Sequence, residues 1–136
     1  MGTLSRDTLL AAARAKELPR EVVELPELGG RVWVRALTGK ERDEWELSNI
    51  VMRRGRAQPK LDNVRARLVV RCLVDDDGAR LFTDADADAL GDLRSDVLAK
   101  LYEVAQRLSK VTEEDLNELK NASGQADGSA FGTSLP

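Results

Sequence analysis

One stretch, residues 31–56, restricts the fold more than any other part of the chain, because a strand pattern and a helix start follow each other directly within it. Val32 and Val34 alternate with Trp33 and Arg35, which is the period of two that a half-buried β-strand requires. The stretch is therefore predicted to begin with a strand, and the next element of the chain begins where this strand ends.

A helix start follows this strand. Thr38 stands three residues before Glu41, so the Thr38 hydroxyl can accept from the Glu41 backbone N–H while the Glu41 carboxylate reaches back to the Thr38 N–H. Acidic residues crowd the next turns and arginines stand at 53, 54 and 56, which matches the two ends of the helix dipole. We therefore predict a helix over 39–53 with Trp45 on its apolar side.

The rest of the chain reads as one small domain. With 136 residues, of which 42% are hydrophobic, the protein can bury one core but not two. Residues 21–25 and 31–36 are joined by the turn residues PELGG, so we predict a β-hairpin over about 21–36. The periodicity and capping residues predict helices at about 5–16, 39–53, 61–74, 84–90, 93–109 and 113–120.

The predicted fold class is therefore α+β, a mainly α-helical single domain over residues 1–120 with an N-terminal β-hairpin. The Gly-, Ser- and Ala-rich residues 121–136 are predicted to form a flexible C-terminal tail. One assignment stays open. The apolar run within 61–74 has helical spacing and predicts a central, largely buried helix, but a buried strand over 68–74 is an alternative, since short apolar runs cannot be assigned by periodicity alone.

The composition argues against catalysis. The chain has no histidine, which excludes Ser-His and Cys-His catalysis, haem ligation by histidine and histidine-containing zinc sites. Cys72 is the only cysteine and lies inside the apolar run LVVRCLV, where a buried structural thiol is expected. No Gly-rich phosphate loop or nucleophile elbow is present. We therefore expect no enzyme activity, no catalytic residue, no cofactor and no metal.

Two charged segments suggest ligands, calcium for the aspartates and phosphate for the basic span, but structural roles explain both segments better. The aspartates between Asp75 and Asp88 do not fit a calcium loop, because Gly78 at position six puts Leu73 at position one, and a start at Asp84 puts Ala89 where Gly belongs. The span 53–71 holds seven basic residues, which could meet phosphate, but it lacks the aromatic residues that stack on bases. Neutralisation by the acidic segment 75–96, within the fold or between copies, explains the span as well, so nucleic-acid binding is the less favoured hypothesis.

The aromatic and basic residues at the centre of the chain are the candidates for a protein interface, since tryptophan and arginine are enriched in such contacts. The predicted interface residues are Trp33, Arg35, Trp45, Arg53, Arg54 and Arg56. The sequence shows neither a secretion signal nor an apolar run of about 18 residues, so we expect a cytoplasmic protein without a membrane partner.

The order of the pieces resembles a known family. The hairpin VVELPELGGRVWVRALTGKERDEWE, the segment RARLVVRCLVDDDGARLFTDADADALGDL with its Leu90-Gly91 break, and the helix VLAKLYEVAQRLSKVTEEDL are similar to the tail assembly chaperones of long-tailed bacteriophages and prophages. The likeness covers about residues 4–121.

The resemblance implies a non-enzymatic chaperone of the host cytoplasm. It would bind the tape measure protein, which is long and largely helical, keep it soluble, help to recruit tail tube subunits, and be absent from the mature virion. Head-to-tail self-association of basic 53–71 with acidic 75–96 of a neighbour is a further hypothesis. The alternatives are a structural tail or head-completion component that stays in the particle, or a small nucleic-acid-binding regulator.

Overall fold

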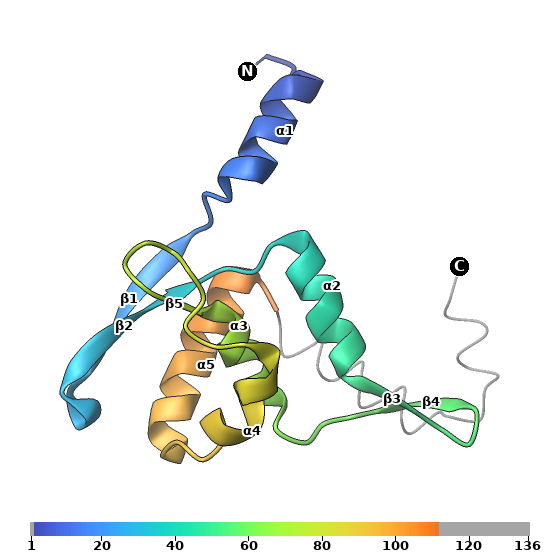
Figure 1. Cartoon of the computed structure of the whole chain (residues 1–136), viewed down its shortest axis with the longest axis vertical. Helices are drawn as coiled ribbons and strands as arrows, with labels where there is room; N and C mark the ends of the chain where they lie inside the picture. Colours follow the sequence, from blue (N-terminus) through green and yellow to red (C-terminus); the bar gives the residue numbers. More distant parts are fainter. Residues whose placement is uncertain (1, 112–136) are drawn as a thin grey trace.

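The computed structural model describes residues 2–111, and Figure 1 shows the arrangement of their helices and strands. The predicted helix at 113–120 and the predicted tail at 121–136 lie outside the described residues. In chain order the elements are α1 (Arg6–Ala15), β1 (Arg20–Leu25), the 3-10 turn η1 (Pro26–Leu28), β2 (Gly30–Arg35), α2 (Gly39–Ser48), β3 (Ile50–Arg53), β4 (Arg56–Pro59), α3 (Val64–Cys72), β5 (Leu73–Val74), the 3-10 turn η2 (Asp84–Asp86), α4 (Ala87–Leu90) and α5 (Ser95–Ser109). The predicted α+β class with an N-terminal hairpin is confirmed.

The main sheet has the strand order β1-β2-β5, and both pairings are antiparallel. Val23 of β1 lies opposite Val32 of β2, and Val34 of β2 lies opposite Leu73 of β5. Because β1 is the outer strand, its other edge has no strand beside it among the described residues.

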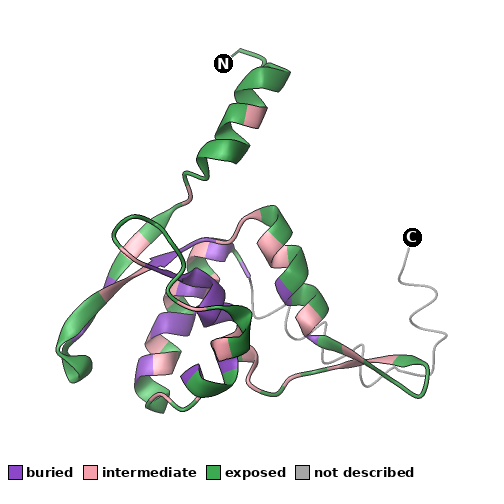
Figure 2. Cartoon of the chain, in the orientation of Figure 1, coloured by how far each residue is buried: buried purple, intermediate pink, exposed green. Residues whose placement is uncertain are grey.

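The core lies between this sheet and the helices α3 and α5, as the buried residues in Figure 2 show. Most of α3 is buried, including Leu68, Val69 and Val70, and α5 contributes Val97 and Leu101. The prediction of a central, largely buried helix is therefore confirmed for α3. Trp45 joins the same cluster from α2 and holds that helix to the core.

Cys72 is fully buried at the end of α3. Burial raises the pKa of its thiol to about 12, which keeps the sulfur protonated and poorly nucleophilic. The predicted structural role is therefore confirmed.

The prediction of one helix over 61–74 needs correction at both ends. The helix begins only at Val64, after Asn63 in the left-handed region, and it ends at Cys72. Leu73 and Val74 form β5, because the edge of β2 offers them backbone partners and both side chains stay buried. The alternative of a strand over 68–74 holds for these last two residues and is wrong for the preceding five.

The prediction of a helix over 39–53 is wrong beyond Ser48. Residues 50–59 form an antiparallel hairpin, with Arg53 of β3 opposite Arg56 of β4. Arg54 and Gly55 between them both have positive φ, 53° and 76°. A two-residue turn with two such residues is the type I′ turn that matches the twist of a hairpin. Gly55 therefore closes a tight turn.

Of the other predicted helices within residues 2–111, 5–16 is seen as α1, 93–109 as α5 from Ser95 onward, and 84–90 as the 3-10 turn η2 followed by the four residues of α4. The Ser5 hydroxyl accepts from the Thr8 N–H and caps α1 as expected. Gly91 follows α4 at a position where a Cβ would lie 2.3 Å from Oδ1 of Asn63, so a larger residue there would displace Asn63. The amide of Asn63 is held in place by its donation to the carbonyl of Ala87 at 2.7 Å. Within residues 2–111, none of the helices is long and apolar enough to span a bilayer.

Candidate interaction surfaces

The helix α1 projects from the body of the molecule and has no buried residue (Figures 1 and 2). Leu4 and Leu9 are 62% and 57% exposed, and the partly exposed Leu10 follows about 100° further around the helix. Isolated helices shorter than about 12–15 residues are marginal in water, and α1 has 10 residues. An exposed apolar side on a helix of this length indicates a surface that binds a partner.

A second projection is the hairpin of β3 and β4, residues 50–59, which we call the arm. No residue of either strand is buried. Ile50 and Met52 alternate along β3 and so share one face, opposite Pro59 and Ala57 of β4. Met52 is 64% exposed. The arm therefore presents an apolar face to solvent, with arginines at its tip.

Arg67 of α3 fixes the root of the arm. One of its guanidinium nitrogens donates to the carbonyl of Ser48 and to Oδ1 of Asn49, and the other terminal nitrogen donates to the carbonyl of Lys60. Its Nε donates to the carbonyl of Asp62. Ser48 ends α2, so the cation also meets the negative end of the helix dipole. One side chain thus joins the end of α2, both roots of the arm and the start of α3.

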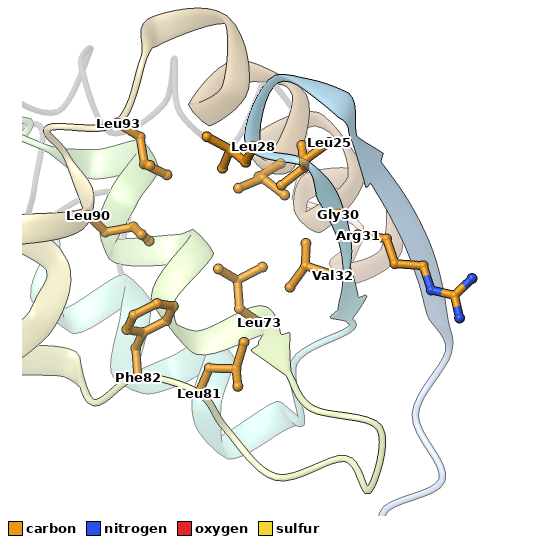
Figure 3. A pocket seen from close by; sticks show the side chains of 11 residues that line it. Leu25, Leu28, Gly30, Arg31, Val32, Leu73, Leu81, Phe82, Leu90 and Leu93 are labelled. Atoms are coloured by element: carbon orange, nitrogen blue, oxygen red, sulfur yellow. The ribbon is translucent and has the colours of Figure 1, made fainter.

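A third surface is an apolar cavity of about 290 Å³ between the β1–β2 hairpin and the segment 81–93. Figure 3 shows the leucine, valine and phenylalanine side chains around this space, while the charged end of Arg31 points away from it. The rim includes Leu81, which is 48% exposed. The lining residues are Leu25, Leu28, Gly30, Arg31, Val32, Leu73, Leu81, Phe82, Leu90, Leu93 and Leu101. We call this space the apolar cavity.

Trp33 lies on the outer face of the sheet, away from the arm. Its indole Nε1 donates to Oδ1 of Asp76 at 2.9 Å, and the guanidinium carbon of Arg20 lies 4.3 Å from the ring centroid. The ring is only partly buried. Trp33 therefore ties the loop after β5 to the sheet and still leaves part of its ring open to a partner.

Arg35 and Glu41 form a bidentate ion pair, with both nitrogen–oxygen distances at 2.7 Å. Their side chains are 10% and 21% exposed. Burial alone would raise the pKa of Glu41, but hydrogen bonds from Arg35 and from the Thr38 backbone lower it to about 2. The hydrogen bonds that Arg35 donates to Glu41, together with the negative charge of Glu41, outweigh burial and raise the pKa of Arg35. The predicted capping box of Thr38 and Glu41 is present, and Arg35 locks it to β2.

The six predicted interface residues do not form one patch. Arg53, Arg54 and Arg56 share the tip of the arm, while Trp33 lies on the sheet. Trp45 and Arg35 are buried within the chain itself. The interface assignment stays a prediction, in which the exposed members can touch a partner and the buried two can only position α2.

The basic span 53–71 is divided by the fold. Arg67 turns inward to carbonyl groups, and Arg71 pairs with Asp84 at 3.1 Å while it is nearly buried. Asp84 also pairs with Arg80 at 2.8 Å. Neutralisation by the acidic segment within the fold is therefore present at Asp84, and Arg67 and Arg71 are both engaged within the chain.

The aspartates that suggested calcium have structural roles. Asp75 accepts the backbone N–H groups of Asp77 and Ala79, and Asp86 caps η2 by accepting from the N–H of Thr83. In the part of the chain that the structure describes, no three side chains of histidine, cysteine, aspartate or glutamate come together as a metal site would need.

Sequence reasoning did not find the arm or the cavity. The signal for the arm was the pair Arg54-Gly55 between IVMR and RAQP, which fits a type I′ hairpin turn. The cavity had no sequence signal, because its lining comes from segments that only the tertiary fold brings together.

Comparisons with known proteins identify relatives of this chain. The family model for phage tail assembly chaperones matches residues 8–121. Among solved structures, the tail assembly chaperone of bacteriophage HK97 is similar, with a TM-score of 0.54 and 21% sequence identity. The match covers 75% of this chain and 97% of that chain, and at this identity it supports the fold. A search of the curated proteins found no match.

The fold and its projecting surfaces define a small α+β protein whose exposed apolar groups suit binding to other proteins. With the family match over most of its length, the chain belongs to the phage tail assembly chaperone family. A chaperone family points to a non-enzymatic role.

Proposed function

We propose that this tail assembly chaperone binds the tape measure protein through α1 and keeps it soluble while the tail is built. The observation that carries the proposal is that α1 projects from the domain with its apolar side uncovered. A largely helical partner could lay its own apolar side along Leu9 and Leu10, as amphipathic helices do when they associate. Recruitment of tail tube subunits rests on the family resemblance alone.

Self-association belongs to the same proposal. A long partner is covered most simply by many copies in a row, and head-to-tail contacts between copies can extend without closing. Arg67 and Arg71 are engaged inside the fold, so the basic side of such a contact falls to the other basic residues of the span, among them Arg53 and Arg54 at the tip of the arm.

The substitution Leu9→Glu is expected to abolish solubilisation of the tape measure protein without unfolding the chaperone. Since α1 contributes no buried residue, a charge there costs the domain little. The measurement is co-expression with overlapping fragments of the tape measure protein, followed by the soluble yield and co-purification of each fragment. At least about a tenfold drop in complex is expected, since a desolvated leucine anchor is worth about 1.5 kcal/mol or more.

Ala11→Glu is the matched control. Residue 11 follows Leu9 by about 200° around the helix, so its charge lies on the opposite side of α1. If wild-type chaperone solubilises a fragment and Leu9→Glu does so equally well, α1 is not the binding site. If wild-type chaperone rescues no fragment, tape measure binding itself is wrong.

A chaperone in the host cytoplasm that leaves the finished tail should be missing from mature particles. Mass spectrometry of purified virions is expected to detect tape measure and tail tube peptides and none from this chain. Its presence at a fixed number of copies per particle would instead identify a structural component.

A further inference from the structure

Among residues 2–111, no element buries either strand of the arm. A two-stranded hairpin is marginal in water unless a further strand or a helix covers it. Yet Ile50 and Met52 stay exposed, with Ala57 and Pro59 beside them on the same face. The arm keeps its position through the Arg67 contacts at its root, which leaves its apolar face available to another molecule.

The apolar cavity offers a matching surface. Its lining is aliphatic and aromatic apart from Gly30 and Arg31, and the guanidinium of Arg31 points outward (Figure 3). The volume of about 290 Å³ is enough to receive two or three aliphatic side chains of the size of Ile and Met. Leu28 and Leu81, both exposed, extend the apolar surface beyond the opening.

The charges of the two surfaces are complementary. The arm contains Arg53, Arg54 and Arg56 and no acidic residue. The segment 82–93 that lines one side of the cavity contains four aspartates and no basic residue. Asp84 is neutralised by arginines of its own chain, but Asp88 and Asp92 are exposed beside the lining residues Leu90 and Leu93. Opposite charges around an apolar contact set its orientation and speed its formation.

One copy cannot make this contact with itself. The arm extends from the body on the side opposite the β1–β2 hairpin, which forms one wall of the cavity (Figure 1). Deepening the self-association proposed above, we infer that the arm of one copy docks in the apolar cavity of a second copy, with Ile50 and Met52 in the cavity and the arginine tip against Asp88 and Asp92. Because the two surfaces differ, the contact is head-to-tail and leaves an arm and a cavity free at the ends of each row.

The association is tested with the purified chaperone alone, so the result does not depend on tape measure binding. Sedimentation over a concentration series at low salt is expected to show masses above that of a monomer for the wild-type chain. Met52→Glu is expected to shift the midpoint of association at least about tenfold upward in concentration, since it buries a charge in an apolar site. Leu9→Glu, which removes the α1 surface, should associate like wild type. A wild-type chain that stays monomeric throughout overturns the inference.

Two single-cysteine substitutions identify the surfaces. The native Cys72 is fully buried, so Met52→Cys and Leu81→Cys introduce the accessible thiols. When these two variants are mixed under mild oxidation with a copper–phenanthroline catalyst, a disulfide-linked heterodimer is expected to form at least about tenfold faster than either homodimer. Faster linkage of Met52→Cys to itself would show an arm-to-arm contact, and equal rates for all pairs would show random collision. Either result overturns the inference.

Discussion

Replacing Arg67 with methionine is expected to lower the free energy of unfolding by about 3 kcal/mol, since acceptors in the folded chain lose their donor together. The guanidinium donates to carbonyl groups of Ser48, Lys60 and Asp62 and to the side chain of Asn49. Asn49 is buried, so water does not replace the lost donor at its oxygen. Methionine keeps much of the aliphatic volume, which separates the lost hydrogen bonds from a packing defect.

The measurement is urea unfolding followed by circular dichroism, together with limited proteolysis. Loss of the root contacts should expose residues 50–59 to cleavage before the domain unfolds, because no residue of β3 or β4 is buried. Arg67→Lys should recover only part of the stability, since an ammonium cannot reach acceptors on three sides with a planar fork.

Arg65→Met is the control on the same helix. Arg65 is exposed, and its guanidinium carbon lies 5.4 Å from the ring centroid of Tyr102, so its loss should cost only about 0.5 kcal/mol. Equal destabilisation by the two methionine substitutions would mean that the Arg67 network contributes nothing beyond a general effect of removing charge from α3.

Arg67 also shows what sequence reasoning can and cannot reach. Local rules predicted the capping box of Thr38 and Glu41, because both partners lie within one helical turn. The same rules placed Arg67 in a basic span that could meet phosphate or be neutralised by the acidic segment 75–96. Nothing in the neighbouring residues reveals that Ser48 and Lys60 come within its reach. The charge of a residue is visible in the sequence, but its partners are set by tertiary contacts.

The misassigned helix end has the same origin. Ile50, Val51 and Met52 continue the apolar content of the preceding helix, so composition alone favoured one long helix over 39–53. The hairpin forms instead because Arg54-Gly55 closes a tight turn and because Arg67 holds both roots of the arm. The Arg67 contacts are long-range interactions. Similarly, the predicted interface combined the exposed arginines of the arm with Arg35. The bidentate partner of Arg35 is only six residues away in the sequence, but the burial of Arg35 depends on the whole sheet.

The second large effect on stability is expected at the ion pair between Arg35 and Glu41. Glu41→Gln is expected to destabilise the protein by about 2 kcal/mol at pH 7, because Arg35 would keep its charge in a mostly buried site without a counter-charge. Glutamine still offers an oxygen to the Thr38 N–H, so the capping acceptor is retained and the loss reports mainly on the ion pair.

The pH dependence of the free energy of unfolding tests the contribution of the Glu41 carboxylate independently. The folded-state pKa of Glu41 is about 2, below its ordinary value of 4.5, so the unfolded chain takes up this proton first as the pH falls. The contribution of Glu41 is therefore complete above about pH 4.5 and is lost between there and about pH 2. Urea unfolding at intervals across this window should show the difference between wild type and Glu41→Gln shrinking steadily toward low pH.

Glu46→Gln serves as the comparison, because Glu46 makes an exposed i,i+4 ion pair with Arg42 on the same helix. Such pairs contribute only about 0.3–0.5 kcal/mol, so this variant should stay close to wild type at pH 7. A difference for Glu41→Gln that does not change between pH 5 and pH 2.5 would show that the lost stability comes from the shape of the side chain rather than from its charge. In that case Arg35 would be held by the carbonyl of Ala36, which lies 3.1 Å from its guanidinium, and the joint between β2 and α2 would not depend on the carboxylate.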